Sequence, residues 1–159
     1  MRETRDMSAG LNPILGIRPA SPADQDFIFD AFKASMKDYV QWAWGWDEEV
    51  QRKGLLVEQN LARFQLITWN GDNAGALLLE PSPEQHYLRT IFLLSQFHGQ
   101  GIGSLVIQSL QRDAQTSGKP LCLRVIHTNP AQQLYVRLGF TVIGQDEKTL
   151  LMQWQAAAF

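Results

Sequence analysis

The stretch that decides the fold is Phe97-His98-Gly99-Gln100-Gly101-Ile102-Gly103-Ser104, in which three glycines stand at alternate positions. It follows an apolar run at 87–94 and opens a helical pattern. Glycine lets the backbone turn sharply and bring several N–H groups close to a ligand. Those groups lie at a helix N-terminus, where the dipole and the unpaired donors both favour an anion. The sequence therefore predicts a phosphate cradle between a strand and a helix.

Composition and charge restrict the class of protein. The chain has 159 residues, of which 45% are hydrophobic and 19% charged, as expected of one globular domain with a substantial core. Its formal net charge is -2 without a basic block, which argues against nucleic acid as a general partner. No apolar run approaches the roughly 18 residues of a membrane span, so we expect a cytoplasmic protein without a membrane partner. The single cysteine and the three histidines have no metal-ligand spacing, so we expect no metal.

Hydrophobic periodicity and turn residues predict a single α/β domain over residues 13–159, preceded by a flexible tail over residues 1–12. Strands are expected at 14–18, 64–69, 74–79, 87–94, 121–126, 140–144 and 148–154. Helices are expected from Ser21, from Asp47, over 101–117 and from Asn129. One face of the helix over 101–117 is expected to hold Ile102, Leu105, Val106, Ser109, Leu110 and Asp113. An antiparallel half followed by one parallel crossover predicts a mixed, mostly antiparallel central sheet flanked by helices.

Two motifs on these elements resemble the GNAT superfamily of N-acetyltransferases. The first is Gly99-Gln100-Gly101-Ile102-Gly103-Ser104, and the second is the run from Asn129 to Phe140, which includes Tyr135 and Gly139. The resemblance extends over residues 14–155. It implies one GNAT-like domain in which the strand at 87–94 splays from the parallel strand at 121–125. It also implies acetyl-CoA as the acyl-donor cosubstrate and acetyl transfer to a primary amine.

The resemblance implies the cofactor-binding residues position by position. In the family, backbone amides of the glycine loop hold the CoA pyrophosphate, and the preceding strand pairs with the pantetheine arm. Here the matching positions are Phe92, Leu93, Leu94, His98, Gly99, Gln100, Gly101, Ile102, Gly103, Ser104, Asn129 and Tyr135. His98 departs from the arginine or glutamine of the family pattern. Since the backbone donors are unaffected, we expect binding to be retained with a weaker attraction for phosphate.

The same resemblance implies that Asn129 and Tyr135 are the catalytic residues. Tyr135 matches the tyrosine that protonates the departing thiolate, although a tyrosine at helical spacing is also typical of a core. Asn129 matches an asparagine near the pantetheine arm, and it is equally suited to cap the helix that begins beside it. A backbone donor near Leu93 or Leu94 would stabilise the oxyanion. The general base stays open among Asp47, Glu48, Glu49, Glu80, Glu84, His86, Tyr87 and His127.

Aromatic residues gather in the region from which GNAT proteins take their acceptor specificity. The candidates for acceptor binding are Tyr39, Trp42, Trp44, Trp46 and Asp47. Aromatic walls with an acid would suit a small cationic amine through cation–π attraction, and a peptide amine is the alternative acceptor. Trp44-Gly45-Trp46 predicts a shaped turn, whereas the competing interpretation is that these tryptophans roof the core. So many tryptophans in a small domain are also compatible with a homodimer.

Two other functions compete with an N-acetyltransferase. A non-catalytic GNAT-fold module would bind acyl-CoA as a sensor or an interaction partner. The absence of an obvious base permits this function, whereas Asn129 and Tyr135 disfavour it. A dinucleotide-binding domain would carry an acid about 20 residues after its glycines. Here the βαβ unit comes late, after an antiparallel half, and that acid is missing, so this class is excluded.

Overall fold

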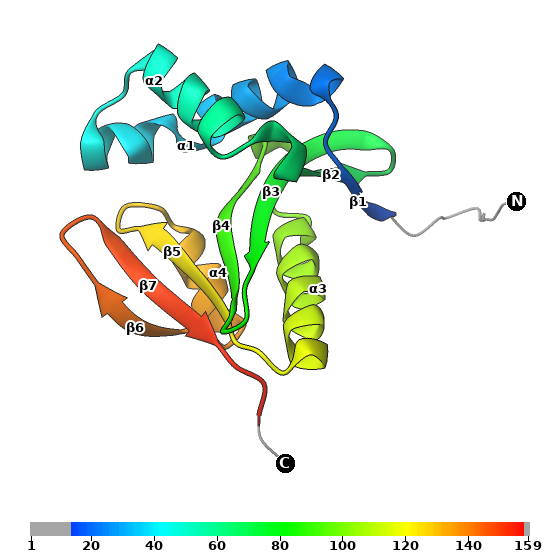
Figure 1. The fold of residues 1–159 in the computed structure, drawn as a ribbon, viewed down its shortest axis with the longest axis vertical. Helices are drawn as coiled ribbons and strands as arrows, with labels where there is room; N and C mark the ends of the chain where they lie inside the picture. Colours follow the sequence, from blue (N-terminus) through cyan, green and yellow to red (C-terminus); the bar gives the residue numbers. More distant parts are fainter. Residues whose placement is uncertain (1–13, 158–159) are drawn as a thin grey trace, which may run out of the picture.

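The computed structural model describes residues 14–157, and the expected tail over residues 1–12 lies outside that range. The strands are β1 (Leu15–Pro19), β2 (Gln65–Trp69), β3 (Asp72–Pro81), β4 (His86–Leu93), β5 (Leu121–Ile126), β6 (Thr141–Gln145) and β7 (Thr149–Trp154). The α-helices are α1 (Gln25–Trp44), α2 (Glu48–Lys53), α3 (Ile102–Ser117) and α4 (Ala131–Arg137). Short helical turns are η2 (Pro22–Asp24), η3 (Gly54–Glu58), η4 (Leu61–Arg63) and η5 (Ser95–Phe97). Their order along the chain follows the predicted order of strands and helices (Figure 1).

The strands form one mixed sheet in the order β1-β2-β3-β4-β5-β7-β6. Neighbouring strands are antiparallel except β4 and β5, which run parallel. The β2–β3 hairpin turns through Asn70 and Gly71, whose φ angles of 52° and 86° are the positive values that a tight hairpin turn requires. The predicted fold class, a mixed sheet with one parallel pair between helices, is therefore confirmed.

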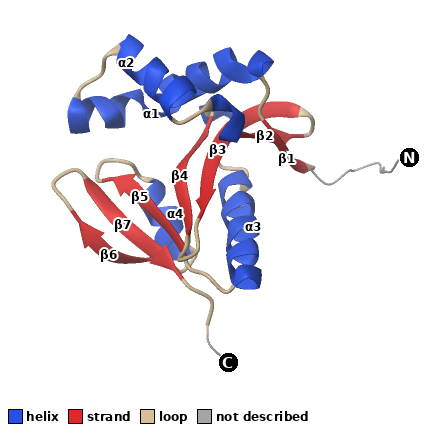
Figure 2. Cartoon of the chain, in the orientation of Figure 1, coloured by secondary structure: helices blue, strands red, loops and turns tan. Residues whose placement is uncertain are grey.

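Helices cover both faces of the sheet, and a separate core lies on each face (Figure 2). On one face, α1 packs on side chains that include Phe64 and Leu78. On the other face, α3 and α4 pack on side chains that include Leu77 and Leu121. Leu77 and Leu78 enter different cores because successive residues of a strand point to opposite faces. No helix within residues 14–157 is long and apolar enough to cross a membrane.

The parallel strands β4 and β5 separate soon after they begin. They pair only over residues 86–88 and 121–123, although β4 continues to Leu93 and β5 to Ile126 (Figure 1). The register between β3 and β4 shifts at Arg89, which makes this residue a bulge. A bulge bends its strand, and this one lies where β4 leaves β5. The predicted splay is therefore present, and the bulge gives its physical cause.

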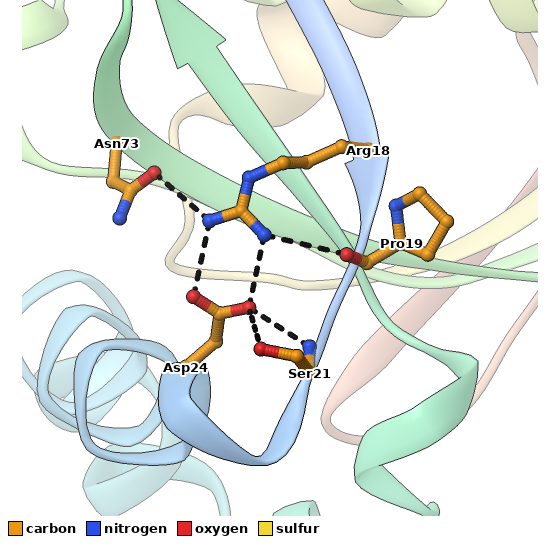
Figure 3. A network of polar contacts seen from close by, with 5 residues as sticks. All are labelled: Arg18, Pro19, Ser21, Asp24 and Asn73. Carbon is orange, nitrogen blue, oxygen red and sulfur yellow. Dashed lines mark hydrogen bonds and ion pairs between the residues drawn. The ribbon is translucent and has the colours of Figure 1, made fainter.

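An ion pair between Arg18 of β1 and Asp24 of η2 holds the start of the first helix (Figure 3). Both terminal guanidinium nitrogens of Arg18 lie 3.0 Å from the carboxylate oxygens. Ser21 donates to the same carboxylate through its backbone N–H (2.8 Å) and its hydroxyl (3.1 Å). The hydrogen bonds from Arg18, and then those from Ser21, lower the pKa of Asp24 to about 2. The predicted helix start at a serine cap followed by proline and an acid is confirmed.

Replacing Asp24 by asparagine is expected to lower the free energy of unfolding by about 1.5–3 kcal/mol, because it removes charge-assisted hydrogen bonds to Arg18. In the wild type, the ionised carboxylate stabilises the fold above its ordinary pKa of 3.8, and this contribution is lost as the pH falls through about 2. Urea unfolding at pH 7 and at lower pH measures both effects. The control is Asp26→Asn, whose exposed ion pair with Arg52 is expected to contribute less than about 1 kcal/mol. Equal stability of the two variants would contradict the proposed role of Asp24.

The end of α1 differs from the expectation for the tryptophan-rich segment. The helix continues through Trp42 and Trp44, so both tryptophans stand on its last turn. Gly45 ends the helix with a φ of 83°, a left-handed conformation that glycine adopts without strain. The shaped turn predicted at Trp44-Gly45-Trp46 is therefore present at the glycine, while Trp44 itself is helical.

The buried face of α3 also differs from the predicted face. Leu105 and Asp113 are exposed, whereas Ile107 and Ala114 are buried. Ile102, Val106 and Leu110 are buried as predicted. The periodicity of the sequence identifies the helix, but the rotation of the helix about its axis is set by how it docks on the sheet. The buried face of α3 is therefore rotated slightly toward Ile107 relative to the predicted face.

Candidate functional site

Two cavities meet where β4 and β5 separate. The first, which we name the loop cavity, has a volume of about 410 Å³ and lies beside the glycine loop over residues 97–104. The second, which we name the arginine cavity, has a volume of about 370 Å³ and is lined by Arg89 and Arg124. The residues that line both cavities are Met36, Ile91, Asn129 and Tyr135. These four residues therefore form a wall that the two cavities share.

The glycine loop presents unpaired backbone donors at the N-terminus of α3. Gly99 and Gly101 have φ angles of 77° and 80°, in the left-handed region that favours glycine. The first helical hydrogen bond runs from the Leu105 N–H to the Gly101 carbonyl (3.1 Å). No hydrogen bond to another described residue uses the N–H groups of residues 99–104. Together with the positive end of the helix dipole, these donors suit an anion such as a diphosphate.

Most of the residues predicted to bind the cofactor line the loop cavity, namely Phe92, Leu93, His98, Gly99, Gly101, Ile102, Gly103, Ser104, Asn129 and Tyr135. Leu94 and Gln100 do not line it. Leu94 packs in the core beneath α1, and the Gln100 side chain donates to the Gln96 carbonyl (3.2 Å). Arg137 of α4 lines the cavity as well, although the sequence analysis did not single it out. The position of this cationic residue, two residues after Tyr135, is the sequence signal that could have identified it.

The edge of β4 that faces the splay offers one backbone donor. The Leu94 N–H donates to the Ala74 carbonyl (2.9 Å), so it is not available as the expected oxyanion donor. Successive residues of a strand direct their N–H groups to opposite edges, so the N–H of Leu93 faces the splay. The Leu93 carbonyl accepts from the Ser35 hydroxyl (3.0 Å) and lies 3.0 Å from His98 Nε2. The His98 side chain therefore ties the glycine loop to β4.

Asn129 combines a capping contact with a place in the wall between the cavities. Its Oδ1 accepts from the Ala131 N–H (2.9 Å), so the side chain caps the start of α4. Its Nδ2 lies 3.9 Å from Met36 Sδ, across the shared wall. One of the two roles left open by the sequence, the helix cap, is present. The side chain still lines both cavities while it caps the helix.

Tyr135 is the buried titratable group of the site. It is 6% exposed, and its ring packs against Phe140 with the ring centroids 5.7 Å apart. Burial raises the pKa of Tyr135 to about 12. No described residue forms a hydrogen bond with its hydroxyl. At neutral pH the group is therefore protonated, and its proton is free for a ligand in either cavity.

A family model described as an acetyltransferase (GNAT) domain matches residues 60–142, which is more than half of the chain. The chain belongs to the GNAT acetyltransferase family. The matched range contains the splayed strands, the glycine loop and Tyr135. A sequence comparison with curated proteins finds no match.

Solved structures share the fold at low sequence identity. The PaiA N-acetyltransferase of Thermoplasma acidophilum, solved in complex with coenzyme A, is 16% identical with a TM-score of 0.74, over 90% of this chain and 99% of that one. The ribosomal-protein-S18-alanine N-acetyltransferase of Escherichia coli is 18% identical with a TM-score of 0.67, over 92% and 96% of the two chains. Ard1 of Thermoplasma volcanium is 14% identical with a TM-score of 0.65, over 91% and 99%. At such identities the likeness concerns the fold alone.

The aromatic residues predicted to bind the acceptor do not line one common cavity. Tyr39 lines the loop cavity, and Trp44 lines the arginine cavity. Trp42 lines neither of these two cavities. Its ring is exposed, and Lys148 Nζ lies 5.0 Å from the ring centroid. The predicted aromatic wall is therefore divided between two sides of the splay.

Trp46 and Asp47 line neither cavity and have structural contacts instead. The Trp46 ring stacks on Phe32 with the centroids 6.0 Å apart, so it roofs the core beneath α1. Asp47 Oδ1 accepts from the Val50 N–H (3.0 Å) and caps α2. The competing interpretation of the tryptophans as a roof over the core thus describes Trp46. Asp47 confirms the predicted start of the second helix.

The candidates for a general base line neither cavity; they are Asp47, Glu48, Glu49, Glu80, Glu84, His86, Tyr87 and His127. Glu80 lies 2.9 Å from Arg89 Nε and 3.4 Å from Arg63, so its charge is already paired. Asp146, which the sequence analysis did not consider, lines the arginine cavity. Backbone hydrogen bonds from the N–H groups of Lys148 and Thr149 lower the pKa of Asp146 and make it a weak base. Within residues 14–157, no group of three His, Cys, Asp or Glu side chains is placed to hold a metal ion.

Proposed function

We propose that this GNAT domain transfers an acetyl group from acetyl-CoA to the primary amine of a small molecule, which attacks the thioester carbonyl directly. The observation that carries the proposal is the position of Tyr135 and Asn129 in the wall shared by two cavities at the splay. A donor in the loop cavity and an acceptor in the arginine cavity would approach each other past these two side chains.

The loop cavity has the chemistry that an acyl-CoA requires. Free N–H groups over residues 99–104 and the Arg137 side chain would hold the diphosphate. The open edge of β4 at Leu93 would pair with the amide-bearing arm of the cosubstrate. Acetyl-CoA supplies the activated acetyl group as a thioester. The chain's own residues orient it and supply a proton.

Tyr135 is the proposed acid of the reaction. The N–C bond forms and the C–S bond breaks, so one proton must leave the nitrogen and one must reach the sulfur. The raised pKa of Tyr135 keeps its hydroxyl protonated at neutral pH, so it can donate to the departing sulfur. The Leu93 N–H is the proposed donor to the oxygen that gains charge.

The amine must be neutral when it attacks. An amine with a pKa near 10.4 is ~99.9% protonated at pH 7, whereas an α-amino group with a pKa near 7.7 loses its proton far more easily. Since the expected bases line neither cavity, an acceptor with the lower pKa fits this site better. The proton would leave through solvent in the exposed arginine cavity.

The second candidate function is a GNAT-fold module that binds acyl-CoA without catalysis. The absence of the expected bases from both cavities favours this alternative. Calorimetric titration with acetyl-CoA, followed by assays of thiol release with small amines, polyamines, amino acids and short peptides, separates the two. Saturable binding with amine-dependent release of CoA supports the transferase. Binding without release over the whole panel would favour the non-catalytic module.

A further inference from the structure

Two arginines lie one residue past the last paired positions of β4 and β5, at the start of the splay. Leu88 of β4 pairs with Leu123 of β5, so Arg89 and Arg124 are the next residues on adjacent parallel strands. Both line the arginine cavity, on the opposite side of the shared wall from the glycine loop. Their side chains are 44% and 45% exposed, and the Arg89 guanidinium also lies 5.6 Å from the Tyr87 ring centroid.

The protein partners of these guanidinium groups leave donors unused. Arg89 donates from Nε to Glu80 (2.9 Å), and Arg124 donates from Nη1 to Thr149 Oγ1 (3.0 Å). Among residues 14–157, the other nitrogens of the two guanidinium groups have no hydrogen-bond partner. A guanidinium carries five N–H donors in a planar fork that matches a carboxylate or a phosphate. The pair is thus placed to bind an oxyanion.

The nearby carboxylates offset only part of this positive charge. Glu80 is shared between Arg89 and Arg63, and the distance to Arg63 is 3.4 Å. Asp146 lies 3.6 Å from Arg124, but it already accepts from two backbone N–H groups in the turn before β7. Three arginines therefore share two carboxylates, which leaves one positive charge in excess. The excess positive charge favours an anionic group in the cavity.

A second polar atom in the same cavity also lacks a partner. Gln59 lines the arginine cavity, and its Oε1 is buried without a hydrogen-bond partner among the described residues. Buried acceptors are nearly always satisfied in folded proteins, so this oxygen is available to water or to a ligand with N–H or O–H donors. The cavity therefore offers donors at its arginines and an acceptor at Gln59.

We infer that the arginine cavity takes an amine that also carries a carboxylate or phosphate group, bound by Arg89 and Arg124. This inference rests on the proposed function and names the class of its acceptor. It replaces the small cationic amine expected from the tryptophans, because only Trp44 of the three candidate tryptophans lines this cavity, whereas both arginines do. The volume of about 370 Å³ suits a small molecule of this class.

Matched amines with and without the anionic group test the inference. Each KM is expressed as the concentration of neutral amine, because a nearby carboxylate or phosphate raises the amine pKa. Glycine with glycinamide, alanine with alaninamide, and phosphoethanolamine with ethanolamine are compared by CoA release at saturating acetyl-CoA. In at least one pair, the KM of the anionic member is expected to be at least about tenfold lower than the KM of the neutral member. Whether that pair carries a carboxylate or a phosphate shows which group the cavity binds. Arg124→Gln and Arg89→Gln are expected to raise that KM by about 10- to 100-fold, without changing the KM of the neutral member. The control Arg112→Gln, on the exposed side of α3, is expected to change neither KM.

A binding measurement keeps this test separate from catalysis. Protein labelled with ¹⁵N-arginine is titrated with the same amines, and the Nε–H signals of Arg89 and Arg124 are assigned from the two variants. Shifts with the anionic members alone, in the absence of any turnover, would support the anion site and overturn the transferase. Turnover that is equal for both members of every pair, or a KM that the Arg124→Gln variant raises equally for both, would overturn the inference and leave the transferase standing. If the titration produces no shifts and the assay detects no turnover, both the inference and the transferase are overturned.

Discussion

Replacing Tyr135 by phenylalanine is expected to lower kcat by about 10²- to 10⁴-fold, because the variant has no proton for the departing sulfur. Affinity for acetyl-CoA is expected to stay within about twofold, since the ring keeps its contact with Phe140. The free energy of unfolding is expected to be unchanged or slightly higher, because the buried hydroxyl has no hydrogen-bond partner to lose among residues 14–157. Steady-state kinetics, calorimetric titration and urea unfolding measure the three quantities.

The matched control is Tyr87→Phe, at a half-buried tyrosine that lines neither cavity. This variant is expected to retain the wild-type kcat. The wild-type enzyme is also expected to show no loss of kcat between pH 7 and about pH 9, since burial raises the pKa of Tyr135 to about 12. A Tyr135→Phe enzyme as fast as the wild type would remove this residue from the mechanism.

Replacing Ser104 by glutamate is expected to weaken acetyl-CoA binding on the order of 100-fold. Ser104 lies in the first turn of α3 and lines the loop cavity. A carboxylate there would face the phosphates and repel them, and like charges brought together in a binding site cost several kcal/mol. The same carboxylate interacts favourably with the helix dipole, so the free energy of unfolding is expected to stay equal or rise by up to about 1 kcal/mol. Loss of affinity without loss of stability is the signature of an anion site.

Two controls separate charge from position in this experiment. Ser104→Gln has nearly the size of the glutamate without its charge, and it is expected to lose less than about tenfold in affinity. Gln108→Glu adds the same charge on the exposed side of α3, outside both cavities, and is expected to bind like the wild type. Wild-type affinity in Ser104→Glu would show that the glycine loop does not hold the phosphates.

The parts of the fold that the sequence predicted well depend on local signals. The hairpin at Asn70-Gly71, the cap at Ser21 and the glycine loop each need residue types that suit one backbone conformation. The helices and strands follow from periodicity, and two motifs in the right order were enough to identify the family. Within the site, this reasoning placed the loop, Asn129 and Tyr135 around one cavity.

The errors concern features that packing decides. Periodicity does not specify how a helix is rotated on a sheet, so Leu105 was expected inside and is exposed. Composition identified an aromatic-rich segment, but only the docking of α1 shows that Trp46 covers Phe32. Leu94 was an equal candidate for the oxyanion donor until strand pairing showed its N–H bound to Ala74.

The arginine cavity is the part of the site that sequence patterns could not predict. Arg89 and Arg124 belong to different strands, and neither forms a motif with its sequence neighbours. They line one cavity because β4 and β5 pair in parallel up to the residues just before them. Asp146 and Gln59 reach the cavity from a turn and from the end of η3. Pairing and chain reversal, which single-sequence patterns do not encode, therefore create this cavity.

The most direct test of the central claim is to identify the product of acetyl transfer. The protein is incubated with ¹³C-acetyl-CoA and the amine panel, and the mixture is analysed by mass spectrometry with Tyr135→Phe in parallel. We expect at least one amine to gain a labelled acetyl group in equal amount to the CoA released, with the variant slower by about 10²- to 10⁴-fold. Binding of acetyl-CoA with no labelled amine over the whole panel would contradict the transferase and leave the acyl-CoA-binding module as the function.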